Sequence, residues 1–295
     1  MKLQEKVEEI LRARDATFGI SIKNLQTNEE VNINEDQLFQ MASVFKIPIL
    51  LTLFDQVYAG KIDLTKRIKI TKKDYVPGSG VIQEMDPGIE VTVKDLATLM
   101  IIVSDNLATD KIYHMIGPEA IEKKMREIGL DNIKIKHSCW ELLSLTVGME
   151  PKAYTDERFA ELHKRLYSDE KFGDDYVLRV DKENNLCTPK EMTSLLEMIA
   201  NGEFVSEECS ERILDIMFRQ QLTQRIPGRL PFGVKVANKT GTINSAVNDA
   251  GIVYLPDNKG AFVISVFSQG NEEVYSGAET IAQISKAAFD YFLRV

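Results

Sequence analysis

The chain contains few cysteines and has no excess of positive charge. Its three cysteines are Cys139, Cys187 and Cys209, and none of them stands in a CxxC pair. The sequence therefore predicts no disulfide framework and slightly favours a reducing compartment. The formal net charge is −9 over 295 residues. This argues against nucleic acids and anionic membranes as partners, because both require a basic surface.

Long apolar runs are also missing, so the sequence predicts no membrane-spanning segment. Near the N-terminus, Leu3, Val7, Ile10 and Leu11 fall on one helical face and charged residues on the other. A signal peptide would instead need an uninterrupted apolar stretch and a small-residue cleavage site. We therefore expect a cytoplasmic protein, with export and removal of a leader as the alternative.

The apolar share of 44% is enough to bury one large core, and we expect a single domain over residues 1–295. Alternating apolar and polar residues predict five strands, at about 18–22, 31–34, 234–237, 251–254 and 261–267. Helical spacing covers about 43–58, 93–104, 107–116, 118–128 and 189–200, and a closing helix begins near 276.

The distribution of these patterns predicts an α/β fold built from two lobes. An antiparallel five-stranded sheet flanked by the terminal helices would form an α/β lobe of about 1–42 and 210–295. An all-helical lobe of about 43–209 would be inserted between them. The charged stretch from Met149 to Asn185 shows no clear pattern, and a long excursion of helices and loop is the expectation there.

A serine and a lysine lie three residues apart in Ala42-Ser43-Val44-Phe45-Lys46. On a helix they share a face, so Lys46 could accept the proton that Ser43 must lose to act as a nucleophile. The lysine can do so only if burial suppresses its charge, and the surrounding apolar residues favour burial. The alternative is a capping serine beside a solvated lysine.

The tripeptide Ser104-Asp105-Asn106 follows the apolar run 99–103. Its hydroxyl could relay a proton to a leaving nitrogen, and its amide could hold both a lysine and a substrate amide. The same composition is also typical of a loop that caps a helix.

A third motif, Lys239-Thr240-Gly241-Thr242, falls on an expected strand. The lysine supplies positive potential, the hydroxyls can hold a carboxylate, and the glycine lets a substrate approach the strand edge. The alternative is a strand that simply ends in a turn.

Together and in this order, the three motifs resemble SxxK, SDN and KTG of penicillin-recognising serine hydrolases, and class A β-lactamases most closely. The resemblance covers nearly the whole chain. It extends to Pro77-Gly78-Ser79-Gly80, Thr188-Pro189 and Asn248-Asp249-Ala250-Gly251. It implies a β-lactamase/transpeptidase-like fold.

The resemblance also implies roles for individual residues. Ser43 would be acylated, and Lys46, Ser104 and Asn106 would transfer protons and position the substrate. The motif of Lys239, Thr240, Gly241 and Thr242 would bind the substrate carboxylate. The backbone N–H groups of Ser43 and Thr242 would form the oxyanion hole.

The chain departs from the family at the arginine that usually follows KTG on the next strand. That place looks like Ala250 here. A known alternative puts the arginine ahead of KTG, and Arg225 fits it. A solvated arginine is the other interpretation.

Deacylation in a class A β-lactamase needs a glutamate on the omega loop to activate water. Trp140-Glu141 matches this element in kind, so Glu141 is the expected base. Leu145 stands where an asparagine is expected, and about 30 extra residues precede Thr188. The omega loop must therefore be remodelled, and an exposed glutamate beside a packed tryptophan is the alternative.

We expect neither metal nor cofactor, because His114, His137 and His163 show no HxxxH or HExxH spacing. The expected function is hydrolysis of a β-lactam through an acyl-serine, by a monomer acting on a small-molecule β-lactam or D-Ala-D-Ala-like substrate. The alternatives are a penicillin-binding DD-peptidase or amidase/esterase with the same acylation machinery, and a β-lactam-binding module without turnover.

Overall fold

The computed structural model describes residues 2–168, 170, 172, 177–181 and 183–294. Its main sheet contains β1 (Thr17–Asn24), β2 (Glu30–Ile33), β7 (Val236–Ile243), β8 (Ala246–Tyr254) and β9 (Ala261–Gln269). The strands lie in the order β2-β1-β9-β8-β7, and every neighbouring pair is antiparallel. The predicted five-stranded sheet made from both chain ends is thus confirmed. The strand β7 is longer than predicted and includes the whole Lys239–Thr242 motif.

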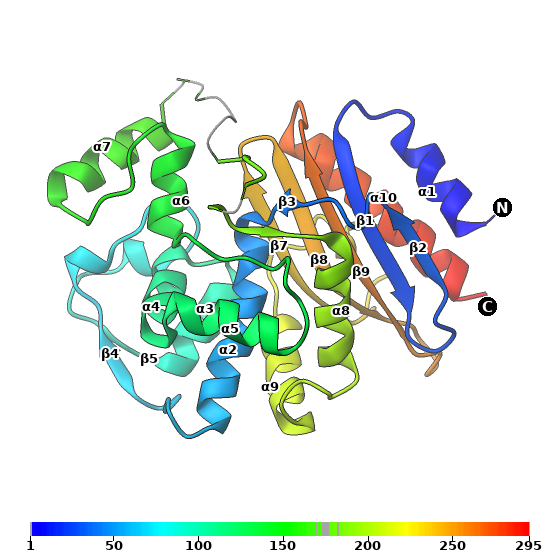
Figure 1. The fold of residues 1–295 in the computed structure, drawn as a ribbon, viewed down its shortest axis with the longest axis horizontal. Coiled ribbons are helices and arrows are strands. Elements are labelled where there is room, and N and C mark those ends of the chain that lie inside the picture. The colour runs from blue at the N-terminus through cyan, green and yellow to red at the C-terminus, as the bar shows by residue number, and fades with distance from the viewer. Residues whose placement is uncertain (1, 169, 171, 173–176, 182, 295) are drawn as a thin grey trace.

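Helices lie on both sides of the sheet (Figure 1), and the buried apolar residues form two hydrophobic cores. Alternation along β9 sends Ile264 and Val266 toward one face, where they pack with α1 (Leu3–Leu11) and α10 (Val274–Phe292). The other residues of the alternation, Val263 and Phe267, join the larger core beneath the remaining helices. Both sheet faces are therefore covered, as expected for an α/β fold.

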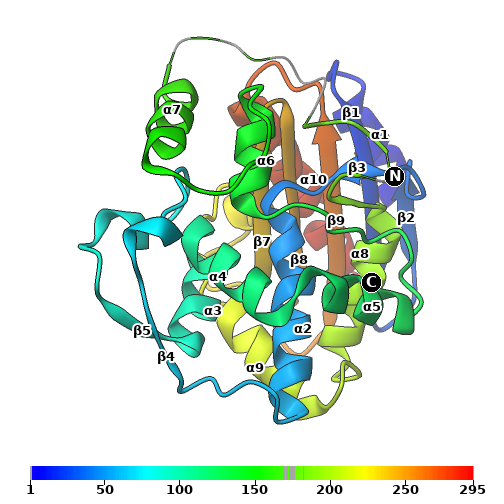
Figure 2. The same cartoon turned by 60° about the vertical axis from the view of Figure 1, so that its left-hand side comes forward.

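The middle of the chain supplies the other helices (Figure 2). They are α2 (Lys46–Tyr58), α3 (Val93–Ile102), α4 (Asn106–Ile116), α5 (Pro118–Glu127), α6 (Cys139–Thr146), α7 (Asp156–Leu166), α8 (Pro189–Ala200) and α9 (Glu207–Met217). Two short antiparallel sheets complete the fold. One pairs β3 (Phe39–Gln40) with β6 (Leu186–Cys187), and the other pairs β4 (Arg67–Lys69) with β5 (Glu90–Thr92). Within the described residues, no helix is long and apolar enough to cross a bilayer.

The helix α2 is the central element of the helical part, because its first nine residues, 46–54, are all buried. A 3₁₀ turn, η1 (Ala42–Phe45), leads directly into it. The predicted helix from residue 43 therefore begins as a tighter turn. Helices α6, α7 and α9 were not predicted, since their segments are either short or strongly charged.

Candidate active site

The turn that carries Ser43 is pressed against the sheet. Ala42 has a positive φ of 45°, which is strained for a residue with a side chain. Gly241 on β7 lies beside this turn, and a Cβ added there would stand 2.7 Å from the Met41 carbonyl oxygen and 3.0 Å from the Ser43 nitrogen. Glycine is therefore required at position 241 for the strand and the nucleophile turn to approach each other.

Asn248 on β8 holds the same turn in place. Its side-chain Nδ2 donates hydrogen bonds to the carbonyls of Gln40 at 2.9 Å and Met41 at 3.1 Å. Its Oδ1 accepts from the backbone nitrogen of Ser268 at 2.9 Å. The carboxamide is fully buried and satisfied at both ends. This residue was part of the quoted motif, but its positioning role was not predicted.

Lys46 opens α2 with its side chain fully buried. Its Nζ donates to the carbonyl of Ser104 at 2.7 Å and to Oδ1 of Asn106 at 2.9 Å, and lies 3.1 Å from Oγ of Ser104. Burial lowers the pKa of Lys46 from its ordinary value, although the groups of Cys139, Asp105 and Asp110 oppose this shift. The lowered pKa favours the neutral amine, which is the form that can accept a proton.

The Ser104–Asn106 turn precedes α4, and its middle residue has a structural role. The carboxylate of Asp105 caps α4 by accepting a hydrogen bond from the backbone nitrogen of Ala108 at 2.9 Å. It also accepts hydrogen bonds from the backbone nitrogens of Val81 at 2.7 Å and Ile82 at 2.9 Å. The side chains of Ser104 and Asn106 instead accept hydrogen bonds from Lys46. The structure thus separates the motif into two site residues and one anchor.

Two further basic side chains, Lys239 and Arg225, lie near Ser104 and the Gly241–Thr242 strand. Lys239 is fully buried and donates to Oγ of Ser104 at 3.1 Å, so this hydroxyl bridges two lysines. Burial, followed by the charge of Lys46, holds the pKa of Lys239 well below its usual range. Arg225 donates to the carbonyl of Gly241 at 2.7 Å and to Oγ1 of Thr242, and burial lowers its pKa.

A cavity of about 150 Å³ lies where these elements meet. It is lined by Ser43, Ser79, Ser104, Leu222, Gln224, Arg225, Thr240 and Thr242. The structure therefore brings together the predicted site residues Ser43, Lys46, Ser104, Asn106, Lys239, Thr240, Gly241, Thr242 and Arg225. The lining residues Ser79, Leu222 and Gln224 were not predicted as site residues, although Ser79 belongs to the quoted Pro77–Gly80 loop.

A family model described as the β-lactamase enzyme family matches residues 2–292. The chain belongs to the β-lactamase enzyme family. It is 26% identical to β-lactamase VEB-1 of Pseudomonas aeruginosa, over 98% of this chain and 89% of that protein. It is also 26% identical to the extended-spectrum β-lactamase PER-1 of the same organism, over 99% and 88%.

Solved structures agree with this β-lactamase assignment. A β-lactamase from Sphaerobacter thermophilus superposes with a TM-score of 0.80 at 25% identity, covering 99% of this chain and 97% of that one. PBP-A superposes with a TM-score of 0.79 at 26% identity, covering 99% and 96%; a mutant of PBP-A was solved as an acyl-enzyme complex with penicillin G. The family and the β-lactamase fold are thus established.

Glu141, the remaining predicted site residue of this β-lactamase-family chain, lies in the first turn of α6. Its Oε2 accepts from the backbone nitrogen of Ser138 at 2.8 Å, and its side chain is 39% exposed. Ser138 and Glu141 form a capping box, so the carboxylate folds back onto the start of α6.

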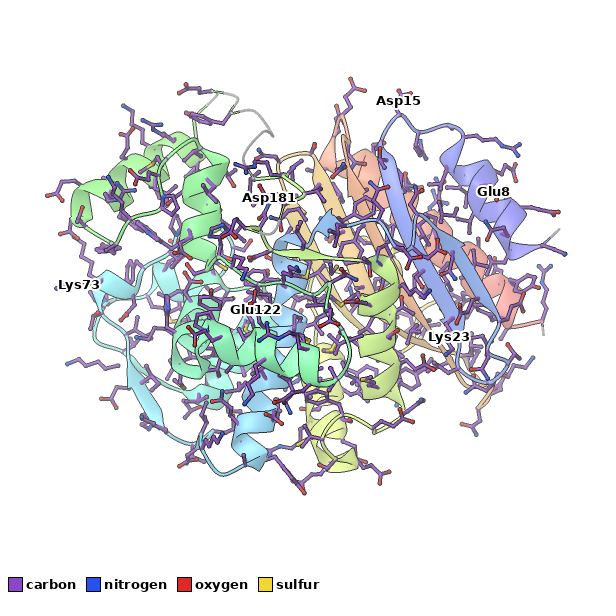
Figure 3. All side chains as sticks on the ribbon, viewed as in Figure 1. Glu8, Asp15, Lys23, Lys73, Glu122 and Asp181 are labelled. Atoms are coloured by element: carbon purple, nitrogen blue, oxygen red, sulfur yellow. The ribbon has the colours of Figure 1, made fainter. Side chains whose placement is uncertain are left out.

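The cavity that Glu141 lines is also a different one. It measures about 280 Å³ and includes Lys73, Lys111 and Tyr154. Lys73 lies at the outer edge of the helical part, away from the sheet (Figure 3). The role of Glu141 as the deacylation base therefore stays a prediction. The pattern Ser-x-x-Glu at 138–141 was the sequence signal that could have revealed the cap.

Proposed function

We propose that the protein hydrolyses the amide bond of β-lactams through a covalent acyl-Ser43 intermediate. The observation that carries this proposal is that Ser43 and Ser104 line one cavity, while the Ser104 hydroxyl bridges the buried amines of Lys46 and Lys239. Lys46, whose pKa is lowered by burial, takes the Ser43 proton as Oγ attacks the carbonyl carbon. Ser104 then returns a proton to the leaving nitrogen.

The substrate carboxylate is matched by the positive charge around the cavity. Lys239 and Arg225 are both buried, and Thr240 and Thr242 present hydroxyls beside them. The buried guanidinium of Arg225 attracts an anionic group strongly because little water screens it. A β-lactam with a carboxylate next to its ring nitrogen satisfies this requirement.

The backbone N–H groups of Ser43 and Thr242 would stabilise the charge that develops on the carbonyl oxygen. The close approach of Gly241 to the Ser43 nitrogen brings the strand and the nucleophile turn near enough for this role. A substrate carbonyl would therefore bind between η1 and β7.

A chromogenic cephalosporin tests the proposal. The wild-type protein should open the β-lactam ring, and Ser43→Ala should abolish both hydrolysis and the mass increase of the acyl adduct. Ser194→Ala, on α8, serves as the matched control, because its hydroxyl bonds to the carbonyl of Lys190 within the same helix. Failure of the wild type to react at all, or full activity of Ser43→Ala, would refute the proposal.

A penicillin-binding peptidase is the second candidate, and the position of Glu141 together with the similarity to PBP-A favours keeping it. Such an enzyme would use the same acylation groups on a D-Ala-D-Ala peptide. Release of D-Ala from such a peptide, at a higher kcat/KM than β-lactam hydrolysis, would select this candidate.

We further propose that the protein acts as a monomer, because the catalytic cavity is complete within one chain. Light scattering after size-exclusion chromatography measures this directly. Its compartment, cytoplasmic or exported, is testable by cell fractionation, and the buried free thiols of Cys139, Cys187 and Cys209 fit either case.

A further inference from the structure

One wall of the catalytic cavity comes from the Arg225 loop (residues 218–225), which joins α9 to the 3₁₀ turn η4 (Ile226–Arg229). This loop supplies Leu222, Gln224 and Arg225 to the cavity lining. The role drawn here for the loop rests on the proposed function, because Arg225 is the match for the substrate carboxylate. Loop residues bind a substrate reproducibly only when a rigid scaffold holds their backbone. The contacts that hold the Arg225 loop therefore bear directly on substrate binding.

The C-terminal end of α3 is the first place where the loop is held. The last four carbonyl groups of an α-helix have no partner within the helix. Gln220 Nε2 donates a hydrogen bond to the carbonyl of Ile101 at 2.9 Å. The backbone nitrogen of Gln221 donates to the carbonyl of Ile102, also at 2.9 Å. The loop thus caps α3 two residues before Ser104.

The side chain of Gln220 also reaches β7 and its own loop. Its Nε2 lies 3.4 Å from the carbonyl oxygen of Asn238, the residue before Lys239. Its Oε1 accepts a hydrogen bond from the backbone nitrogen of Leu222 at 3.0 Å. Gln220 is only 6% exposed, and both ends of its carboxamide are hydrogen-bonded inside the protein. One buried carboxamide therefore contacts three segments that bound the cavity.

The proton-transfer groups have other supports that do not involve Gln220. The Ser104 hydroxyl is held between Lys46 and Lys239. The carboxylate of Asp105 fastens the same turn to the neighbouring loop and to the start of α4. Loss of the Gln220 carboxamide would therefore loosen the wall formed by the Arg225 loop and leave the acylation groups in place.

We propose that Gln220 is a positioning residue for substrate binding, because it ties the Arg225 loop to the end of α3 and to β7. The wall is thereby held where Arg225 meets the substrate carboxylate. A side chain that only capped α3 would need no contact with the loop. The hydrogen bond from Leu222, three residues before Arg225, joins the cap to the cavity wall. Substrate binding accordingly depends on Gln220 more strongly than the acylation step does.

Stopped-flow acylation of the full-length protein tests this role, with benzylpenicillin as the probe. The dependence of the rate on its concentration separates the dissociation constant of the complex before acylation from the acylation rate constant at saturation. Gln220→Ala should raise the dissociation constant about tenfold, since the contact between Arg225 and the carboxylate is weakened. The acylation rate constant should stay within about threefold of the wild-type value. The uncharged methyl ester of benzylpenicillin should show a change in dissociation constant of less than about threefold.

Two further variants separate this role from a general loss of packing. Gln220→Met keeps the length of the side chain but loses its hydrogen bonds, so it should reproduce the effect of Gln220→Ala without leaving a cavity. Gln221→Ala is the matched control, because Gln221 is exposed and its side chain donates to the nearby carbonyl of Arg219. Its backbone bond to Ile102 remains in this variant. Both constants should stay within about twofold of the wild type in Gln221→Ala.

A double variant tests whether Gln220 acts through Arg225. Changes that act through one contact are not independent, so Gln220→Ala combined with Arg225→Ala should bind benzylpenicillin within about threefold of Arg225→Ala alone. Multiplication of the two single effects would overturn the proposal, and so would an equal rise in the dissociation constant for the methyl ester. Normal acylation by the wild type together with an unaffected Gln220→Met variant would refute the positioning role alone. A wild type that forms no adduct and opens no β-lactam ring would instead refute the proposed function, and this role with it.

Discussion

Replacing Asp110 by asparagine tests how α6 is fastened to α4. The aspartate accepts two N–H groups, from Cys139 and Trp140, and it is buried. An asparagine can accept only one of them with its carbonyl oxygen, and its own NH₂ group would face the second donor. One charge-assisted hydrogen bond is lost, and one buried N–H is left without an acceptor.

The size of the effect follows from these two losses. Loss of a hydrogen bond to a charged group costs about 1.5–3 kcal/mol, and a buried unsatisfied donor costs about 1–3 kcal/mol. Burial raises the pKa of Asp110, so the native protein already spends free energy to keep this carboxylate ionised. Removing the charge recovers part of that cost. We therefore expect Asp110→Asn to lower the free energy of unfolding by about 2 kcal/mol.

Equilibrium unfolding in urea measures this loss. Trp140 is the only tryptophan of the chain, and its backbone nitrogen donates a hydrogen bond to Asp110. Its fluorescence therefore reports on the turn that the substitution affects. Asp86→Asn, a change at an exposed loop position, serves as the control and should alter stability by less than about 0.5 kcal/mol. A loss of less than about 0.5 kcal/mol in Asp110→Asn would refute the fastening role of the carboxylate.

Four further outcomes are expected. Gly241→Ala should slow acylation about hundredfold in stopped-flow assays, because the new Cβ would displace the nucleophile turn. Arg225→Ala should raise KM for carboxylate-bearing β-lactams by about tenfold or more, since a charge-assisted contact is lost, while the effect on neutral ester analogues should be small. Acylation should rise with pH through the lowered pKa of Lys46, because only the neutral amine accepts the serine proton. Burial raises the pKa of Asp249 to about 6. Between about pH 4 and pH 6 the native state therefore keeps a proton that the unfolded chain loses, so the free energy of unfolding falls as the pH rises through this range. Urea titrations at several pH values should show that Asp249→Asn makes this fall smaller.

The sheet and the acylation groups could be predicted from the sequence because their signals are local. Alternation marks a strand, and the spacing of Ser43 and Lys46 marks a shared helical face. The lobe boundaries near residues 42 and 210 stay a prediction. Arg225 was predicted only through a resemblance. In the structure, the carboxylate of Asp249 accepts a hydrogen bond from the backbone nitrogen of Ile226 at 3.0 Å, and this contact holds the neighbouring Arg225 in place.

The position of Glu141 could not be predicted from its neighbours in the sequence. A Trp-Glu pair suggests a family element, but the side of α6 that faces Lys46 depends on where the helix begins. Asp110, almost 30 residues earlier in the chain, fixes that start by binding the amides of Cys139 and Trp140. A shift of two positions along a helix reverses the face, so the Trp-Glu pair alone cannot say which way Glu141 points.

The pairing of β1 with β9 has a consequence for the synthesis of the protein. The strand β1 forms in the first residues made, but its hydrogen-bond partner β9 is among the last to leave the ribosome. At roughly 5–20 residues per second, β1 waits roughly 10–50 s with one edge unpaired. During this interval, the apolar residues Phe18, Ile20 and Ile22 lack the residues of β9 and α10 with which they later form a core. The nascent chain therefore exposes an apolar strand until its C-terminal elements emerge.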